Sequence, residues 1–402
     1  MRIVFKIFAI LALLILIGIA VLFGSLWLER RSEVTLPAPT GPLAVGRTMY
    51  AWGDDKPDGV APVPGTKREV IVWMWYPAAV EKSETATAEY LPASWRAGFQ
   101  QQGSGLMRFL TRDLAQVRSH SMPDAAVSAQ EQSYPVVILR GGASANVTNY
   151  SALAEDLASH GYIVAGIDAP YRTNVVVFPD GRVVKRIRAN DPEAAAGQQS
   201  THAVTDLLEA WTADIGFVLD RLELLNGSDP SSRFKGRLDL TRVGVFGHSF
   251  GGAQAAQFCS EDSRCKAGID LDGMPLGSVI QTGIHQPFMF LLSDHSRESD
   301  AESRRVKADI QSIYDRLPAE GRLRVEIRGA NHFVFSDDGA LLKTRLLRGA
   351  MRLFGKLGID GDRQLAVTAH CVHSFFDANL KSTTEKRADI SFARFPEIQV
   401  LE

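Results

Sequence analysis

The amino-acid sequence predicts one doubly wound α/β domain built on a mostly parallel sheet. Three observations predict it: short apolar runs typical of buried strands, helical runs between them, and a serine flanked by glycines at one strand-to-helix turn. The alternation continues over roughly 300 residues, the extent of one large α/β domain. Of the 402 residues, 45% are hydrophobic and 22% charged, so the chain can bury a sizeable core.

An apolar segment precedes this domain. Residues 7–28 carry no charged side chain, and as a helix they would measure roughly 33 Å, enough to cross the hydrocarbon core of a bilayer. A cleaved signal peptide is the alternative, but the run is long for one and no A-x-A-like site follows it. We therefore favour an uncleaved anchor. The expected division is an anchor or signal peptide at residues 1–31, a proline-containing linker at 32–45 and the α/β domain at 46–402.

The order of strands and helices follows from hydrophobic periodicity. Residues 68–76 are rich in β-forming side chains and end at a proline. Residues 136–139, 151–160 and 162–168 have the pattern of strand, helix and strand, which is a βαβ unit. Further strands are expected at residues 240–246, 267–271, 287–292 and 323–327, and further helices at residues 205–225 and 363–380.

Two segments interrupt this alternation. Residues 85–134 carry aromatic and aliphatic side chains between two strands, and residues 175–187 resemble a hairpin turned at PDG. Each segment either packs over the sheet as a decoration or forms a lid or a wall of an acyl pocket. We favour decoration for the hairpin, and both interpretations stay open for the longer segment.

The most informative stretch is GHSFGG at residues 247–252, which lies between an apolar strand and a helix-like run. Strand, G-x-S-x-G and helix form the nucleophile-elbow pattern of α/β-hydrolases. The turn is so tight that Gly247 and Gly251 must flank the serine. The hydroxyl of Ser249 is then exposed at a helix N-terminus, where negative charge is favoured. Ser249 is the predicted nucleophile.

A serine hydroxyl needs a histidine base, and the histidine needs a carboxylate that holds its tautomer. In α/β-hydrolases the acid and then the histidine follow the serine along the chain. His332 comes directly after the strand at residues 323–327, in the loop where the base is expected. His332 is therefore the predicted base.

The other histidines after the serine have weaker support. His285 and His295 flank the strand at residues 287–292. His370 and His373 fall one turn apart in the final helix, which we expect them to cap or cover. No cysteine or carboxylate set in the sequence completes a metal site with them, so no metal is expected.

The acid has candidates at two strand ends. Asp270 and Asp272 end the strand at residues 267–271, and Asp294 follows the next strand. Alternation of side chains puts Asp270 and Asp272 on the same side of the strand, but Asp272 lies nearer the catalytic edge. We predict Asp272 as the acid and keep Asp294 as the alternative.

An oxyanion hole needs two N–H groups. One comes from Phe250, directly after the nucleophile, and the other from the loop after an early strand. The loop RGGAS at residues 140–144 follows such a strand, and its glycines let the backbone approach a substrate closely. Gly142 is the predicted second donor, with Gly141 and Ala143 as the alternatives one register away.

The cysteine spacing bears on the cellular compartment of the protein, and its charge bears on the expected partners. Cys259 and Cys265 enclose a short loop after the elbow helix, and in an exported domain they could form a disulfide, whereas in the cytosol they would be free thiols. The anchor favours export, and we expect the domain to lie outside the cytoplasmic membrane. The net charge is −2 and no basic block is present, so nucleic acid is not an expected partner.

Several motifs together resemble the platelet-activating-factor acetylhydrolase group, plasma type and isoform II, with its bacterial relatives among the α/β-hydrolases. They are GHSFGGA at residues 247–253, LDGMPLG at 271–277, LASHGYIVA at 157–165, GPLAVG at 41–46 and WYPA at 75–78. The resemblance extends from Gly41 to about Leu380. It implies calcium-independent ester hydrolysis, best known for short acyl chains on phospholipids, and it favours Asp272 over Asp294. The sequence departs from the family at Arg140, where the family usually has His before glycine.

The sequence thus predicts a membrane-anchored serine esterase that needs no cofactor, with short-acyl phospholipids or other lipid-like esters as substrates. Bacterial relatives also include general carboxylesterases and polyester hydrolases, so the resemblance does not fix the substrate. An amidase or peptidase on the same three residues is one alternative. A hydrolase-fold binding protein without catalysis is another, although such proteins usually lose the serine, the histidine or the acid.

Overall fold

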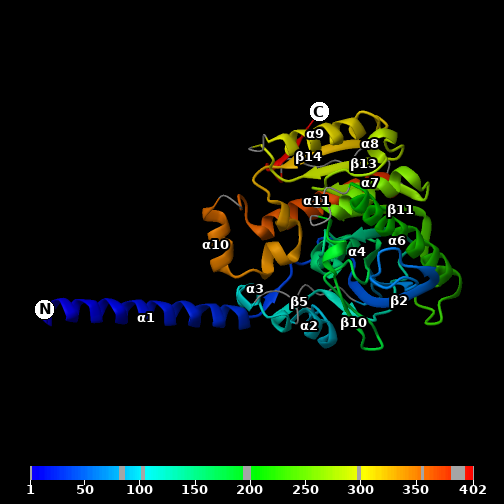
Figure 1. The fold of residues 1–402 in the computed structure, drawn as a ribbon. Helices are drawn as coiled ribbons and strands as arrows, with labels where there is room; N and C mark the ends of the chain where they lie inside the picture. Colours follow the sequence, from blue (N-terminus) through cyan, green and yellow to red (C-terminus); the bar gives the residue numbers. More distant parts are fainter. Residues whose placement is uncertain are drawn as a thin grey trace.

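A ten-stranded sheet forms the centre of the molecule, and helices cover both of its faces (Figure 1). The computed structural model describes residues 2–80, 87–100, 105–192, 201–296, 300–354, 357–381 and 394–401. In spatial order the strands are β15 (Ile398–Val400), β14 (Arg322–Ile327), β13 (Phe288–Leu292), β12 (Cys265–Leu271), β11 (Leu238–His248), β7 (Tyr134–Arg140), β8 (Ile163–Asp168), β3 (Lys67–Pro77), β2 (Val45–Pro57) and β6 (Ser121–Pro123).

Most of the sheet is parallel, as the sequence predicts. The pairing is parallel from β14 through to β8, because each of these strands is separated from the next by a crossover. Strand β3 is antiparallel to both β8 and β2, and β15 is antiparallel to β14, so the complete sheet is mixed. Periodicity located the central strands, whereas it gave no signal for the short edge strands β6 and β15.

Alternation along each strand divides the core between the two faces of the sheet. On β7, Val137 and Leu139 pack on one face with α4 (Ser151–Ser159) and α11 (Gly361–Leu380). Val136 and Ile138 pack on the other face with α6 (Thr201–Ser228), α7 (Phe250–Glu261) and α9 (Ala301–Tyr314). A parallel strand covered on both faces must be apolar throughout, which explains its continuous hydrophobic run. The helices are α1 (Arg2–Arg31), α2 (Ala93–Gln100), α3 (Gly105–Phe109), α4 (Ser151–Ser159), α6 (Thr201–Ser228), α7 (Phe250–Glu261), α8 (Val279–Thr282), α9 (Ala301–Tyr314), α10 (Arg345–Leu353) and α11 (Gly361–Leu380).

The strand order changes direction between β11 and β7. From β7 the chain continues to β8 on one side, and later returns to place β11 on the other side. The loops that follow β7 and β11 therefore diverge and leave a crevice at the carboxyl ends of these strands, where open α/β sheets bind ligands. Ser249 and the loop at residues 141–146 lie at this point.

Helix α1 projects from the domain (Figure 1). Among the described residues it is the one helix long and apolar enough to cross a membrane, a criterion that a signal sequence near the N-terminus can also meet. Its last turn is fixed to the domain by hydrogen bonds. Arg112 Nη1 donates to the carbonyl of Glu29 at 2.8 Å, Arg30 Nε donates to the carbonyl of Thr111 at 3.0 Å, and the Arg345 N–H donates to Glu29 Oε1 at 2.8 Å. The helix therefore leaves the domain at a defined place beside α3 and α10.

The stretch expected to act as a linker lies on the surface of the domain. Strand β1 (Val34–Thr35) pairs with β5 (Val117–Ser119), and Leu36 is buried in the core. Further along, the N–H and hydroxyl of Thr40 both donate to Asp156 Oδ1 on α4. These contacts leave little free length between α1 and the domain.

The two segments that interrupt the alternation lie together. The hairpin predicted at residues 175–187 forms from β9 (Val175–Val177) and β10 (Val183–Lys185), which pair antiparallel. Helix α2, from the longer segment, packs closely against this hairpin. At Gly98 the contact is so close that an added Cβ would lie only 3.0 Å from Val177 Cγ2. The hairpin thus supports α2. Residues 85–86 and 101–104 of the longer segment lie outside the described part.

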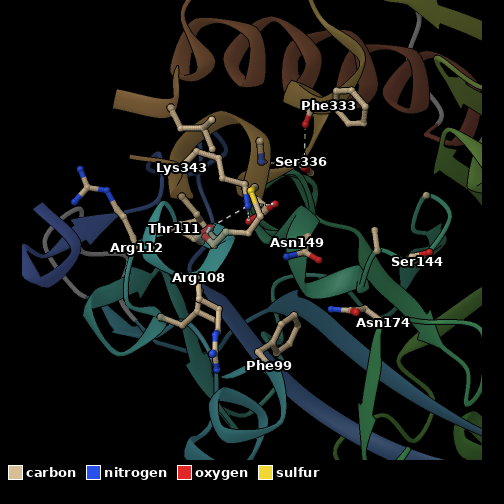
Figure 2. Close-up of a pocket in the computed structure, with 18 of the residues that line it drawn as sticks. Phe99, Arg108, Thr111, Arg112, Ser144, Asn149, Asn174, Phe333, Ser336 and Lys343 are labelled. Carbon is tan, nitrogen blue, oxygen red and sulfur yellow. Dashed lines mark hydrogen bonds and ion pairs between the residues drawn. The ribbon is translucent and has the colours of Figure 1, made fainter. Parts of the chain in front are cut away.

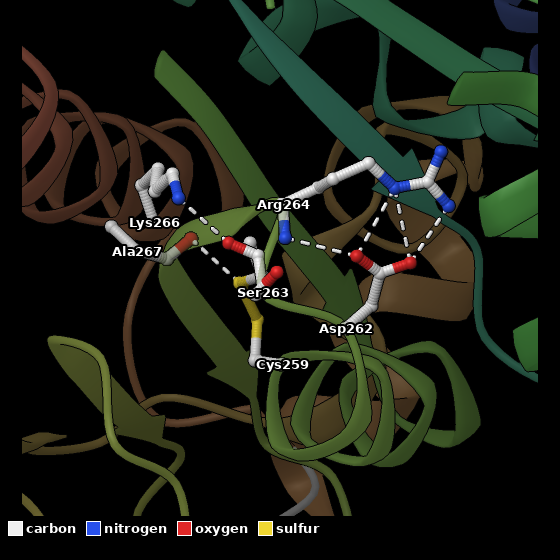
Figure 3. The surroundings of a disulfide bond; sticks show 7 residues. Cys259, Asp262, Ser263, Arg264, Lys266 and Ala267 are labelled. Atoms are coloured by element: carbon white, nitrogen blue, oxygen red, sulfur yellow. Dashed lines mark hydrogen bonds and ion pairs between the residues drawn. A yellow bond between two sulfur atoms is a disulfide. The ribbon is translucent and has the colours of Figure 1, made fainter. Parts of the chain in front are cut away.

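A disulfide joins Cys259 on α7 to Cys265 on β12, as the spacing allowed (Figure 3). The loop between them carries Asp262 and Arg264, whose side chains form an ion pair at 2.7 Å. The disulfide therefore fixes the end of α7 that lies opposite the nucleophile.

Replacing Cys259 and Cys265 together by alanine should lower the free energy of unfolding by about 2 kcal/mol, because closing a loop with a sequence separation of 6 removes that much chain entropy from the unfolded state. Urea unfolding of the purified domain, with and without reductant, measures the change. Wild-type protein in reductant should match the double variant. Equal stability of the oxidised wild type and the variant would contradict the expectation.

Candidate active site

The strand-to-helix turn at Ser249 has the geometry of a nucleophile elbow. Strand β11 ends at His248, α7 begins at Phe250, and Ser249 between them has φ 56° and ψ −123°. A Cβ on Gly247 would lie 2.2 Å from the carbonyl oxygen of Gly251, so a larger residue at Gly247 would force the turn apart. This strained conformation of a non-glycine residue is characteristic of functional sites.

His332 reaches the same edge of the sheet from β14. It begins the short helix η4 (His332–Phe335), which follows the loop after β14. Its Nδ1 lies 2.7 Å from Asp272 Oδ2, at the end of β12. The predicted base and acid are therefore in hydrogen-bond contact, although 60 residues separate them in the sequence.

Asp272 is buried and has four hydrogen-bond donors. Its Oδ1 accepts from the Ser293 N–H at 2.8 Å and from His295 Nε2 at 2.7 Å, and its Oδ2 accepts from the Ser293 hydroxyl at 2.7 Å as well as from His332. Burial alone would raise the pKa of Asp272, but the hydrogen bonds and charges of His295 and His332 outweigh it and hold this pKa well below its usual range. Asp272 therefore stays ionised beside the imidazole.

The alternative acids have other contacts. Asp294 Oδ2 accepts from the Gly329 N–H at 2.7 Å, and Asp294 Oδ1 accepts from the N–H and hydroxyl of Ser296. Asp270 is fully buried and accepts from the Gly273 N–H at 2.6 Å; burial raises its pKa to about 8, so it is largely protonated at neutral pH. Of the three carboxylates, Asp272 is the one that accepts from His332 Nδ1.

Ser249 and His332 line one cavity of about 950 Å³. Among the described residues, no hydrogen bond joins the Ser249 hydroxyl to the His332 ring. Such bonds are often long before a substrate closes the site.

A hydrogen-bonded chain behind the nucleophile fixes the backbone of His332. His248 Nε2 donates to the His332 carbonyl at 2.9 Å, and His248 Nδ1 accepts from the Tyr150 hydroxyl at 2.8 Å. Burial, together with the nearby His332, lowers the pKa of His248 to about 3, so this ring is neutral and keeps the proton that it donates. Sequence reasoning missed both His248 and Tyr150, because the middle positions of G-x-S-x-G carry no periodic signal and Tyr150 lies on a different element.

The Tyr150 hydroxyl also contacts the loop that was predicted to supply the second oxyanion donor. The Gly142 N–H donates to this hydroxyl at 3.1 Å. The next residue, Ala143, lines the cavity, and within the described residues its N–H makes no hydrogen bond. The N–H of Phe250 is at the start of α7, where the first turn leaves donors without helical partners.

The longer inserted segment forms one wall of the cavity (Figure 2). Phe99 on α2, Met107 on α3 and Leu114 face the space from this side, and Leu347 and Met351 on α10 add further apolar surface. Figure 2 also shows Arg108, Arg112 and Lys343 around the space. Of the two interpretations left open for this segment, the pocket wall agrees with the structure. The cavity combines apolar walls with cationic side chains.

We expect His295, whose Nε2 lies 2.7 Å from Asp272 Oδ1, to position this carboxylate, a role that the sequence did not indicate. Replacing it by alanine should lower kcat/KM by roughly tenfold, because Asp272 would lose one charge-assisted hydrogen bond while keeping Ser293 and His332. His295→Gln keeps a donor and should recover part of the loss. Initial rates with p-nitrophenyl acetate across the pH range test this, and an unchanged rate in the alanine variant would exclude the role.

The family model of platelet-activating factor acetylhydrolase, isoform II, matches residues 28–175 and 211–390 of this chain. The chain belongs to the platelet-activating factor acetylhydrolase isoform II family. The match includes the elbow, Asp272 and His332, and it confirms the resemblance drawn from the sequence motifs.

Similar proteins and a solved structure agree with this family. A probable 1-alkyl-2-acetylglycerophosphocholine esterase of Arthroderma benhamiae is 25% identical, over 92% of this chain and 95% of its own. A platelet-activating factor acetylhydrolase of Cavia porcellus is 26% identical, over 78% of this chain and 73% of its own. The structure of a ferulic acid esterase from Streptomyces cinnamoneus superposes with a TM-score of 0.73 and 27% identity, over 92% of this chain and 100% of that one.

All of these relatives are named as enzymes that cleave carboxylic esters. Together with the family membership, they make this chain a carboxylic-ester hydrolase. The mixed sheet with helices on both faces fits the α/β-hydrolase fold of such enzymes.

Proposed function

We propose that this family member hydrolyses esters through an acyl-enzyme on Ser249, with His332 as base and Asp272 as acid. The observation that carries the proposal is the 2.7 Å contact between His332 Nδ1 and Asp272 Oδ2, beside a cavity that the strained Ser249 also lines. The contact leaves His332 Nε2 as the nitrogen that can exchange a proton with the Ser249 hydroxyl.

The reaction proceeds in two halves. Ser249 Oγ forms a bond to the ester carbonyl carbon while His332 Nε2 takes its proton. As the tetrahedral intermediate collapses, His332 returns this proton to the leaving alcohol and the acyl group stays on Ser249. In the second half, water attacks the acyl carbon while His332 Nε2 takes one of its protons. The bond between the acyl carbon and Ser249 Oγ then breaks, His332 returns the proton to Ser249 Oγ, and the carboxylic acid leaves. The ionised Asp272 stabilises the imidazolium in both halves.

The oxyanion is held by two backbone donors. We assign the first to the Phe250 N–H at the start of α7 and the second to the Ala143 N–H, since Gly142 donates to Tyr150. Gly142 still matters as a glycine. A Cβ there would lie 3.2 Å from His248 Nδ1 and 3.3 Å from Ser249 Cβ, so a larger residue would press on both side chains and shift this loop relative to the nucleophile.

The mouth of the cavity supports a lipid-like ester as substrate. Arg30, in the last turn of α1, lines the cavity together with residues of α3 and α10. These two helices also carry exposed apolar side chains, and we call this surface the rim. Its apolar residues are Leu106, Met107, Leu346, Leu353 and Phe354, and its exposed basic residues are Arg108, Arg345 and Arg352.

A surface that mixes exposed apolar and basic side chains suits the interface of a bilayer with anionic headgroups. Because α1 ends at this surface, a membrane crossed by α1 would meet the rim and the cavity mouth (Figure 1). We propose that α1 anchors the enzyme and that esters with a short acyl chain, including short-acyl phospholipids, enter the cavity from the membrane. The Cys259–Cys265 disulfide favours an oxidising compartment outside the cytoplasmic membrane.

A variant of the rim tests the substrate class. Leu353→Ser with Phe354→Ser should lower the rate on a short-acyl phospholipid in vesicles by at least about tenfold, because two large exposed apolar side chains no longer enter the interface. Hydrolysis of soluble p-nitrophenyl acetate should not change. Val63→Ser, at an exposed apolar position away from the rim, is the matched control. Equal losses on both substrates, or none, would contradict the lipid assignment without affecting the esterase assignment.

Acyl length and the ester bond itself are tested on the wild-type protein. We expect p-nitrophenyl acetate and butyrate to be cleaved faster than the palmitate ester, and the matching acetanilide to be cleaved slowest. Faster cleavage of the anilide would favour an amidase on the same residues.

A further inference from the structure

A second cluster of ionisable side chains lies on the opposite end of α4 from the active-site loop. Asp156 and His160, one turn apart near the end of α4, meet His373 of α11. Asp156 Oδ2 accepts from His373 Nδ1 at 2.9 Å and lies 3.9 Å from His160 Nε2. All three are described residues, and none of them lines the catalytic cavity. The sequence gave no carboxylate partner for His373, because Asp156 is 217 residues away.

We propose that Asp156, His160 and His373 form a binding site for one borderline transition-metal ion, with Zn²⁺ as the best match. Two imidazole nitrogens and one carboxylate oxygen are a common ligand set for Zn²⁺, and a water completes four-coordination. Ca²⁺ and Mg²⁺ prefer oxygen ligands, so two imidazoles select against them.

The distances suit an ion with bonds of 2.0–2.1 Å. In a tetrahedral site with such bonds, two ligand atoms lie roughly 3.4 Å apart. In this cluster the ligand atoms lie within 4.8 Å of one another, and the two carboxylate–imidazole distances of 2.9 and 3.9 Å bracket the tetrahedral value. The imidazole rings of His160 and His373 are stacked, with centroids 4.1 Å apart and an interplanar angle of 24°. Because a metal–nitrogen bond lies in the plane of the ring, one of the two rings must rotate to bring both nitrogens to the same ion.

The site is partly preformed and screened from solvent. The side chains of Asp156, His160 and His373 expose 5%, 20% and 13% of their surface, which leaves room for a water ligand from one side only. Asp156 Oδ1 is held by the N–H and hydroxyl of Thr40, so its Oδ2 is directed toward the histidines. These hydrogen bonds act as the outer-shell contacts that orient ligands around metal ions.

The neighbouring groups are compatible with a cation. Lys381 is the nearby positive charge, donating to the His160 carbonyl, and it is paired with Asp377 at 2.5 Å. The Thr40 hydroxyl lies 2.9 Å from His160 Nε2 and would rotate away or contribute its oxygen when the ion binds. When His373 Nδ1 becomes a ligand, its proton moves to Nε2, so the ring stays neutral and no proton is lost.

The bound ion would join three parts of the chain. Asp156 belongs to α4 and His160 directly follows this helix, His373 belongs to α11, and Thr40 belongs to the segment that leads from α1 into the domain. Binding to the folded state alone stabilises that state. The inference concerns stability and metal content and is independent of the esterase proposal.

The test uses the full-length protein in detergent micelles, with any histidine tag removed and residual metal stripped by chelator. Isothermal titration with Zn²⁺ should give one ion per chain with a dissociation constant in the micromolar range or tighter, and should raise the thermal midpoint by several degrees. Co²⁺ in place of Zn²⁺ should give a visible absorption band of a four-coordinate ion. Excess Mg²⁺ or Ca²⁺ should not compete.

Variants assign the binding to these side chains. His160→Ala and His373→Ala should each weaken Zn²⁺ binding at least tenfold and abolish the rise in the thermal midpoint, whereas His285→Ala, at an exposed histidine, should bind as the wild type does. Circular dichroism checks that each variant is folded. If only one of the two site variants folds, its Zn²⁺ binding alone is sufficient to decide the assignment. No saturable Zn²⁺ binding by the wild type, or unchanged binding in a folded site variant, would overturn the proposal.

Discussion

Replacing Ser249 by alanine is expected to lower kcat for p-nitrophenyl acetate by about 10⁵- to 10⁶-fold, which leaves a residual rate set by the oxyanion donors and by binding. The expectation rests on the elbow. A residue held at φ 56° between β11 and α7 presents its hydroxyl to the cavity, and alanine removes the attacking oxygen without disturbing the turn. KM should change little, because the cavity walls are intact.

The companion variants make this prediction specific. His332→Ala should lower kcat by about as much as Ser249→Ala does. The double variant should lower kcat little further, since the serine and its base act as one unit. Ser260→Ala, at a serine eleven positions further along the sequence near the far end of α7, is the matched control and should keep the wild-type rate. Additive losses in the double variant would show that Ser249 and His332 do not act on the same step.

Replacing Asp272 by asparagine should lower kcat by about 10⁴-fold, because a neutral amide no longer fixes the tautomer of His332 or stabilises its charged form. Asparagine has nearly the same size as aspartate, so the shape of the substrate site should be kept. KM of the variant should therefore stay within a few-fold of the wild-type value. The pKa of Asp272 lies well below its usual range, so this carboxylate does not titrate between pH 4 and 9. Protonation of Asp272 should therefore contribute no change of rate in this range.

Asp294→Asn is the control for the acid. Asp294 contacts Gly329 and Ser296, so its replacement should affect the loop after β14 and lower kcat by less than tenfold. Initial rates of the two variants under saturating substrate decide between them. A loss of about 10⁴-fold in Asp294→Asn, with nearly full activity in Asp272→Asn, would reassign the acid and leave Ser249 and His332 in place.

Local pattern was sufficient to predict the part of the fold that holds the nucleophile. The strands β7 and β8 and the carboxyl-terminal halves of β11 and β12 are mostly apolar because both of their faces are buried, and such runs are visible in the sequence. The elbow was recognisable because its glycines are required by sterics at Gly247 and Gly251. Asp272 and His332 follow strand ends, so topology alone brought them to the same edge of the sheet.

Contacts between distant segments could not be predicted in the same way. The use of the Gly142 N–H depends on Tyr150, and the orientation of Asp272 depends on Ser293 and His295. None of these contacts leaves a periodic trace, since each joins side chains on different elements. The Asp156–His373 pair is the extreme case, because α4 and α11 become neighbours only when the sheet has formed.

The most direct test of the account is covalent labelling with a fluorophosphonate, which reacts with an activated serine and with few other groups. Intact mass and peptide mapping of the inhibited enzyme should show one adduct per chain, located on Ser249, with loss of ester hydrolysis in proportion to labelling. His332→Ala should label far more slowly. An inactivated enzyme whose adduct lies on another residue, or an enzyme that keeps hydrolysing esters with Ser249 fully labelled, would contradict the proposed nucleophile.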